Sequence, residues 1–395
     1  MAGRVTLSQA VLLQMAVYWA HIFFLPISII HKLTSITENF IWGGSSKQRK
    51  FHLSKMDRIS LPKNLGGWGL KDLRTFGKAL LCKSLCRGIF GVGPWSETIQ
   101  QKYLKGKGLE YWYRKGAMGI QRGSAIWLSF RKVEKLFLSK LRWRIHTGNM
   151  ILIGLDPIAC KHSFFLPEDI IFALHRMGIF TWDKLILDWS GLSPIWKSAD
   201  EVGLSVVHFS SWVVVIASLQ SCGIVRGGLS DHLFWFTPNA SAPVRVKDIY
   251  SDLIITKDMG IACIFPMSLW NSRCPPRMIF FAWLVFSNRN ITWDNLRKRS
   301  WHGPSRCSMC ESAEETNLHM FFQCISTQEI WYELAILFYF PHIVFDSVHA
   351  TFHWLVSQRD TCRPLLVIMI WFSWKWRNHT IFKDSRAPYK SILPV

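Results

Sequence analysis

The sequence has no apolar run that is long and uninterrupted enough to cross a membrane, and its N-terminus does not read as a secretion signal. A membrane-spanning helix needs about 20 predominantly apolar residues. The longest apolar stretch, 11–30, contains Gln14, His21 and Pro26. These absences favour an intracellular protein, nuclear or cytoplasmic, without membrane association.

Acidic residues are scarce, and the residue groupings that catalysis needs are missing. Only 26 Asp and Glu stand against 47 Lys and Arg, which gives a formal net charge of +21 over 395 residues. Histidines such as His21, His52 and His146 have no nucleophile or carboxylate at a spacing that indicates catalysis. We therefore expect no enzymatic activity.

Most of the cysteines follow no repeated spacing. The sequence therefore does not predict the disulfide framework of a small secreted protein, and we expect free thiols in a reducing compartment. The cysteines without a pattern are Cys82, Cys86, Cys160, Cys222, Cys263, Cys274 and Cys362.

Four residues near the C-terminus do form a pattern. Cys307, Cys310, His319 and Cys324 have the spacing C-x2-C-x8-H-x4-C. Thiolate and imidazole are the ligands that zinc prefers, and a closed set of four leaves no open position for a substrate water. The pattern predicts a structural Zn²⁺ site, and the alternative is four unrelated residues packed in an apolar core.

The sequence around these residues predicts how they are presented. Two stretches, 312–315 and 326–329, have the composition of capping boxes at helix N-termini. The first helix would carry His319, and the second would begin just after Cys324.

The positive charge is concentrated in one segment. Between Lys47 and Arg144 there are 23 Lys or Arg and five acidic residues, a net charge of +18. Such density predicts a polyanionic partner, most simply the nucleic-acid backbone of RNA or DNA. The expected phosphate contacts are Lys102, Lys105, Lys107, Arg114, Lys115, Arg131, Lys132, Arg142 and Arg144.

Aromatic residues are interleaved with these cations. They would stack on unpaired bases, or, as the alternative, point into a core beneath a solvated basic face. They are Trp68, Tyr103, Tyr111, Trp112, Tyr113, Trp127 and Trp143.

The apolar pattern predicts a mainly α-helical fold with short β hairpins. A helical N-terminal region would precede a small zinc-stabilised helical domain, and 49% hydrophobic residues provide enough material for buried cores. Helices are expected at 6–24 and 28–42, with Asp72 opening another. A hairpin is expected around 143–149, with Thr147-Gly148-Asn149 as its turn.

Short motifs surround the predicted zinc ligands in a fixed order. They are 246–250, 269–271, 275–284, 291–296, 307–310, 314–319, Cys324 and Trp331. Together they resemble the zinc-binding domain that lies downstream of the reverse transcriptase in plant LINE-type non-LTR retrotransposons. The resemblance extends N-terminally through 2–7, 17–19, 25–26, 39–44, 61–63, 66–70 and 72–73, which are similar to the region after the polymerase palm. It also includes 374–378 and 381–382, which resemble the approach to a ribonuclease H domain.

The resemblance implies a division into four segments. Residues 1–150 would form a basic helical region like the post-palm or thumb part, and 151–243 a poorly defined connection. The reverse transcriptase zinc-binding domain would occupy 244–331, and 332–395 would be an apolar helical tail.

The departures from this family bear on activity. Its polymerase depends on adjacent aspartates that hold two metal ions, and this sequence contains no Asp-Asp pair. The sequence also begins after that place and stops before a ribonuclease H carboxylate cluster. The resemblance therefore implies a non-catalytic polyprotein fragment that binds nucleic acid non-specifically, with an intact reverse transcriptase as a further partner.

Two alternatives stay open. The acidic residues Glu311, Glu314 and Glu315 beside the ligands would suit a protein–protein adaptor that docks a basic partner. The other alternative is a decayed element that is rarely or never translated and has no function.

Overall fold

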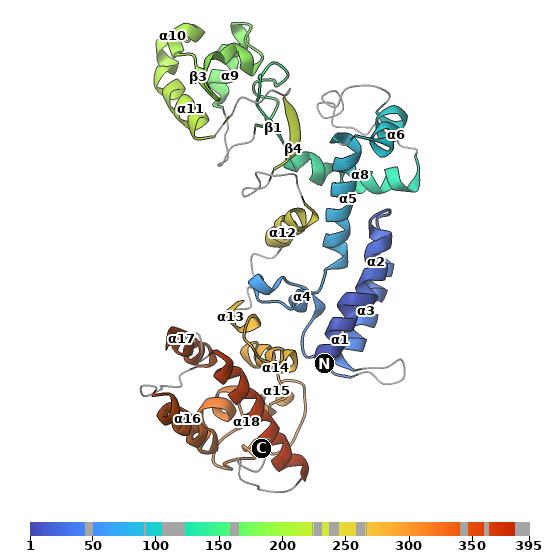
Figure 1. The fold of residues 1–395 in the computed structure, drawn as a ribbon, viewed down its shortest axis with the longest axis vertical. Helices are drawn as coiled ribbons and strands as arrows, with labels where there is room; N and C mark the ends of the chain where they lie inside the picture. The colour runs from blue at the N-terminus through green and yellow to red at the C-terminus, as the bar shows by residue number, and fades with distance from the viewer. Residues whose placement is uncertain are drawn as a thin grey trace. The chain divides into compact units, whose positions relative to one another are not determined.

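The computed structural model describes residues 1–43, 50–90, 92–104, 123–158, 166–222, 224, 231–236, 245–257, 265, 267–339, 347–358 and 363–383. These residues are mainly helical, with two small antiparallel sheets, which confirms the predicted fold class (Figure 1). The chain forms two compact units. Unit 1 comprises 1–16, 27–73 and 258–395, and unit 2 comprises 17–26 and 74–257.

Unit 1 combines the N-terminal helices with the C-terminal part of the chain. The first predicted helix runs from Ala2 to Ala20 and enters unit 2 in its last turn, and the second spans Ile27–Trp42. The elements are α1 (Ala2–Leu7), η1 (Ser8–Leu12), α2 (Leu13–Ala20), α3 (Ile27–Trp42), α4 (Met56–Ile59), η2 (Lys63–Leu65), α13 (Met267–Trp270), α14 (Pro276–Phe286), α15 (Trp293–Arg297), η5 (His319–Gln323), α16 (Ile325–Phe338), α17 (Val348–Gln358) and α18 (Arg363–Lys383).

Helix α14 is the centre of the unit 1 core. It is apolar on every face, which is typical of a buried helix, and all but its first two residues are buried. Trp283 donates its indole N–H to the Gly66 carbonyl, and its ring meets Trp68 edge-on at 5.2 Å. On another face, Phe281 packs against Trp371 of α18 at 5.7 Å. The helix thus joins segments that are far apart in the sequence.

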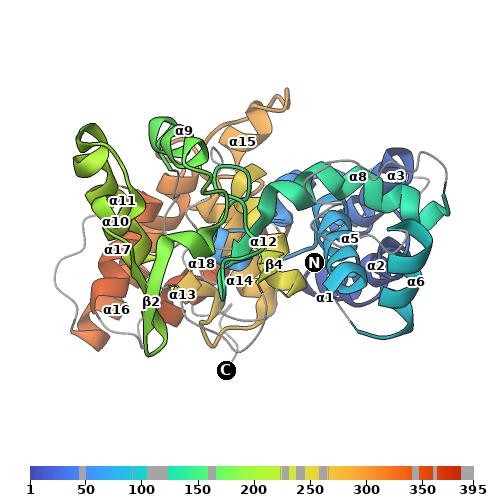
Figure 2. The ribbon, with the colours of Figure 1, turned by 90° about the horizontal axis from the view of Figure 1, so that it is seen from above.

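Unit 2 is built around aromatic side chains of α8 and of one small sheet. Figure 2 shows the ribbon of α8 from above. Trp127, Phe130 and Phe137 on α8 are almost fully buried, as are Trp143 and Trp235 on paired strands. The elements are α5 (Leu73–Phe90), α6 (Pro94–Tyr103), α8 (Ala125–Lys140), β1 (Leu141–Arg144), α9 (Glu168–Arg176), η3 (Trp182–Leu185), β2 (Ile186–Ser190), β3 (Ser193–Trp196), α10 (Ala199–Val202), η4 (Val206–His208), α11 (Phe209–Ser221), β4 (His232–Trp235) and α12 (Val246–Lys257).

The hairpin predicted around 143–149 is wrong. Strand β1 pairs antiparallel with β4, so that Leu141 lies opposite Trp235 and Arg144 opposite His232. The predicted turn residues do turn the chain, but they lead away from the sheet instead of into a neighbouring strand. A local pattern of apolar residues and a Gly turn cannot reveal a strand partner that lies about ninety residues further along the chain.

The carboxylate of Asp231 holds this turn. Its Oδ1 accepts the backbone N–H groups of His146, Thr147 and Gly148 at 2.7, 2.9 and 3.0 Å, and its Oδ2 accepts that of Met150 at 3.3 Å. Asp231 is only 5% exposed. Burial raises the pKa of Asp231, but these N–H groups lower it by more, so the pKa lies below its usual value.

We expect Asp231→Asn to destabilise unit 2 by about 1–3 kcal/mol at pH 7, because the buried N–H groups lose a charged acceptor. A carboxyl whose folded pKa is lowered stabilises the protein above its unfolded pKa, about 3.9, and stops doing so as the pH falls through the folded pKa. The free energy of unfolding, measured with urea at pH 7, should therefore be lower for the variant than for the wild type. This difference should shrink below about pH 4. The exposed Asp188 is the matched control, and an equal effect of Asp188→Asn would contradict this role.

Two further findings concern the membrane and thiol predictions. None of the helices that the structure describes is long and apolar enough to cross a membrane. Cys82, Cys86 and Cys274 are free thiols, as predicted. Cys222 is disulfide-bonded, which corrects the expectation of a free thiol at that position.

Candidate metal centre

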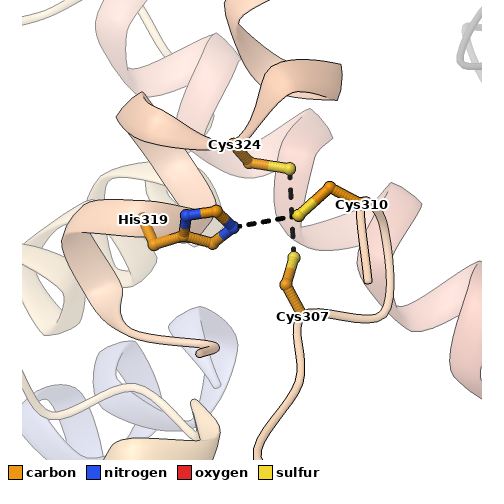
Figure 3. A group of neighbouring side chains, drawn as sticks. All are labelled: Cys307, Cys310, His319 and Cys324. Atoms are coloured by element: carbon orange, nitrogen blue, oxygen red, sulfur yellow. Dashed lines mark hydrogen bonds between the residues drawn. The ribbon is translucent and has the colours of Figure 1, made fainter. Parts of the chain in front are cut away.

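Cys307 and Cys310 lie on a tight turn that backbone hydrogen bonds close. The Cys307 N–H donates to the Ala313 carbonyl at 2.8 Å, and the Glu311 N–H donates to the Cys307 carbonyl at 2.9 Å. Glu311 has a left-handed φ of +55°, which reverses the chain directly after the second thiol. Both sulfurs therefore face the inside of the turn (Figure 3).

His319 and Cys324 come from the helical segment that follows. His319 is the first residue of η5, and Cys324 is the N-cap of α16. The Thr316 hydroxyl accepts the His319 N–H at 3.1 Å and so caps the turn that carries the imidazole.

The N-caps of both helices differ from those predicted. The helix that presents His319 begins after Thr316 and not at 312–315, because the Glu315 carboxylate binds Arg377 instead of capping. Helix α16 begins directly after Cys324, as predicted, but its N-cap is Cys324 and not the first residue of the predicted box at 326–329. The two predicted helices exist, but the residues chosen as their caps are wrong.

The four side chains converge on one point (Figure 3). Their ligand atoms all lie within 4.8 Å of one another. Cys307 Sγ lies 3.9 Å from Cys324 Sγ, and Cys310 Sγ lies 3.2 Å from His319 Nε2. Tetrahedral zinc, with bonds of about 2.3 Å to sulfur and about 2.0–2.1 Å to nitrogen, separates two sulfurs by about 3.8 Å and a sulfur from a nitrogen by about 3.5 Å. The cluster fits a closed Cys3His zinc site.

The surroundings of the buried thiols favour thiolate at one of them. The Cys307 thiol donates to Cys324, and this bond, with the N–H groups of Ser326 and Thr327, lowers the pKa of Cys324 to about 5. The same bond, followed by burial, raises the pKa of Cys307. Because zinc binds thiolates, metal binding displaces the protons of these thiols.

Polar contacts fix the turn and its helix to the core of unit 1. Ser312 Oγ donates to Cys310 Sγ at 3.1 Å, and Asn317 Nδ2 donates to the Val285 carbonyl of α14 at 2.6 Å. Hydrogen bonds of this kind orient the side chains that bind a metal ion. No local pattern predicts these contacts, because Ser312 has the composition of a helix cap and Asn317 stands only in the family motif 314–319.

A buried ion pair lies next to the ligands. Glu315 and Arg377 make two hydrogen bonds, Nη2 to Oε1 at 2.6 Å and Nε to Oε2 at 3.1 Å. The Arg377 guanidinium also lies 4.9 Å from the Trp374 ring centroid. The sequence did not predict this pair, because its members lie 62 residues apart and belong to separate motifs, 314–319 and 374–378.

Five of the predicted phosphate contacts lie within the described residues. Lys102 is on α6, Arg131 and Lys132 are on α8, and Arg142 and Arg144 are on β1. Lys102, Lys132 and Arg144 are exposed, whereas the other two are half-buried. The predicted contacts outside the described residues are Lys105, Lys107, Arg114 and Lys115.

Most of the aromatic residues expected to stack on bases are core residues instead. Trp68, Trp127 and Trp143 are at most 2% exposed, and Tyr103 stacks on Trp127 at 4.1 Å. The alternative of a core beneath a basic surface is therefore correct for these residues. Tyr111, Trp112 and Tyr113 lie outside the described residues.

Comparisons with known proteins support the metal centre. Residues 245–331 match the family model described as zinc-binding in reverse transcriptase. The chain is 26% identical over 412 residues to an Arabidopsis thaliana protein whose name describes it provisionally as a ribonuclease H protein. That alignment covers 97% of this chain and 61% of the relative, so the chain spans less than two thirds of that protein. These matches confirm the predicted relation to the C-terminal region of a retrotransposon reverse transcriptase, and with it zinc as the structural cofactor.

Proposed function

We propose that the chain is a non-catalytic, nucleic-acid-binding part of a retrotransposon reverse transcriptase. Its zinc would be held by Cys307, Cys310, His319 and Cys324. The observation that carries the proposal is the convergence of these four side chains inside the matched domain. A closed set of four ligands orders the chain and leaves no position for a substrate water, so the metal contributes folding free energy and not chemistry.

Nucleic acid, as RNA or DNA, is the proposed partner, bound through its backbone. Lys132 lies on α8, and Arg142 and Arg144 lie on β1, which follows α8 directly in the chain. Cations of this kind fix the position of a nucleic acid without reading its sequence. We propose that 1–150 supplies this basic region, 151–243 a connection, 244–331 the zinc-binding domain and 332–395 a helical tail. An intact reverse transcriptase, in the nucleus or cytoplasm, is the proposed protein partner.

The proposal predicts the salt dependence of binding. Replacing Lys132, Arg142 and Arg144 by Gln in one triple variant should make the negative slope of log K against log salt shallower by about 2 for single-stranded DNA. Each lost phosphate contact contributes about 0.7 to this slope. Fluorescence anisotropy with a labelled oligonucleotide at several salt concentrations measures this slope.

The control for this triple variant removes the same charge elsewhere in unit 2. Arg176, Lys184 and Arg245 are exposed and lie on other segments. Their combined replacement by Gln should leave the slope closer to that of the wild type. Equal slopes in the two triple variants would show that only net charge matters and would contradict this assignment.

One observation favours the alternative of a protein–protein adaptor. The outer face of α16 exposes Ile325, Tyr332 and Ile336 at 62%, 69% and 60%, and the acidic Glu329 lies among them. Such a face would suit a partner that is both basic and apolar. Binding of that kind should depend weakly on salt, whereas nucleic-acid binding should weaken steeply.

A further inference from the structure

Two exposed aromatic rings of unit 1 meet at the surface. Phe51 is 54% exposed and Trp301 is 49% exposed, yet their centroids lie 5.9 Å apart with the ring planes at 63°. The buried aromatics of the basic segment differ in this respect, because their faces are covered by protein. We name the Phe51–Trp301 pair the aromatic platform.

The backbone fixes the position of Trp301. The Trp301 N–H donates to the Leu296 carbonyl at 3.3 Å, and the Ser300 N–H donates to the Arg297 carbonyl at 3.0 Å. This is the double hydrogen bond of a Schellman motif, with Ser300 in the left-handed region at φ +63°. A side chain held by such a motif after α15 loses little further freedom when a ligand covers it.

One arginine, Arg299, lies beside the platform. The Arg299 guanidinium is 5.7 Å from the centre of the Phe51 ring. Burial, followed by the nearby charge of Arg289, lowers the pKa of Arg299. Among the described residues, neither arginine has a carboxylate within ion-pair distance, whereas the neighbouring Arg297 and Lys298 bind Glu314 and Asp294. A guanidinium group beside an exposed ring and without an acidic partner favours an anion next to it.

Further exposed cations lie close to the platform in the sequence. Lys50 precedes Phe51 in the sequence, and Arg306 follows Trp301 after a short loop; both are exposed. The combination of exposed rings and unneutralised cations differs from the α16 face, where exposed apolar residues accompany acids.

We propose that the aromatic platform stacks on unpaired bases of single-stranded nucleic acid while Arg289 and Arg299 contact its phosphates. Every base has a π face, so stacking on Phe51 and Trp301 would accept any sequence. A duplex would fit poorly, because its bases already stack on one another. The inference rests on the proposed nucleic-acid function and adds a second contact surface to it, on unit 1.

The test compares two labelled oligonucleotides of equal phosphate count: a thymidine 12-mer and an abasic 12-mer. In the full-length, zinc-loaded chain, Trp301→Ala should weaken binding of the thymidine 12-mer by about 5- to 150-fold, the range expected for one lost stacking contact. It should leave the affinity for the abasic 12-mer unchanged. Trp301→Phe should restore most of the loss.

Further variants separate stacking from charge and from misfolding. Replacing Arg289 and Arg299 with Gln should weaken binding of both oligonucleotides and reduce the salt slope. Tyr332→Ala removes a 69% exposed ring from α16 and should change neither affinity. Phe51→Leu keeps a side chain of similar size without a ring and provides a second stacking variant if Trp301→Ala fails to fold, as judged by circular dichroism and zinc content.

The outcomes distinguish the two proposals. If Trp301→Ala and Phe51→Leu leave thymidine binding unchanged, or weaken both oligonucleotides equally, the platform does not stack on bases. If this happens while the Lys132, Arg142 and Arg144 variant still loses affinity, the proposed function stands without the platform. If the wild type binds neither oligonucleotide, both proposals fail. Preferential, Trp301-dependent binding of polyglutamate over the thymidine 12-mer would overturn the inference in favour of an acidic protein partner.

Discussion

Cys307→Ser should release zinc from the protein and unfold the turn and helices around it. A serine hydroxyl does not replace a thiolate as a zinc ligand, and Cys307 is buried within 4.8 Å of the other three ligand atoms. Structural zinc contributes an apparent folding free energy of about 10–16 kcal/mol in isolated zinc-finger peptides. We therefore expect the folding of the zinc-binding domain, 244–331, to depend on its metal. Metal analysis of the purified chain should fall from about one zinc per chain to almost none, with a loss of helical circular dichroism.

Cys274→Ser is the matched control for this variant. Cys274 is also in unit 1, is half-buried and is a free thiol, but it lies outside the cluster. It should retain its zinc and its helicity. A chain with Cys307→Ser that keeps its zinc and its helix content would show that Cys307 is not a ligand. Chelation of the wild type should reproduce the effect of the Cys307 variant.

Arg377→Met should cost about 3–5 kcal/mol of stability, the second largest effect expected. The Arg377 and Glu315 side chains are only 8% and 3% exposed, and both hydrogen bonds between them are inaccessible to water. Removing the guanidinium leaves a buried carboxylate whose remaining partner is the Trp293 N–H at 3.1 Å. Urea unfolding of the zinc-loaded chain measures the cost.

An exposed ion pair next to this one provides the control. Arg297 and Glu314 approach to 2.8 Å, but their side chains are 64% and 41% exposed. Solvent screens such a pair, so Arg297→Met should cost no more than about 1 kcal/mol. A double variant, Glu315→Leu with Arg377→Met, should recover part of the loss because no charge is then left buried. Equal costs for Arg297→Met and Arg377→Met would contradict this account of the buried pair.

The buried pair also shows how far the zinc turn depends on the rest of unit 1. The family match ends at 331, yet Arg377 lies on α18, which packs against α14 through Trp371 and Phe281. Glu315 therefore links the segment between the ligands to a helix beyond the matched residues. Zinc loss is expected to loosen α18 as well as the turn.

The sequence predicted the zinc cluster because the four ligands are close together in the chain. Ligands within 18 residues can converge without help from distant segments, and the helices next to them have apolar patterns that the sequence shows. The caps were mispredicted for a physical reason. Glu315 has the composition of a cap, but its carboxylate is bound by an arginine that no local pattern could indicate.

Features that depend on distant partners could not be predicted in the same way. The residues after Arg144 have the local pattern of a hairpin turn. In the structure, β1 pairs with β4, and Asp231 accepts the backbone N–H groups of the turn. Trp127 and Trp143 stand among cations in the sequence, yet their rings are in the core, because a local charge pattern does not show which face of a helix or strand is covered. The platform of Phe51 and Trp301 is likewise formed by segments that are distant in the sequence.

X-ray absorption at the zinc edge of the purified full-length chain tests the metal centre most directly. Bound zinc should show three sulfur neighbours at about 2.3 Å and one nitrogen at about 2.0–2.1 Å, with no oxygen in the first shell. A first shell made only of nitrogen and oxygen, or a chain that neither retains nor takes up zinc, would contradict the assignment of Cys307, Cys310, His319 and Cys324.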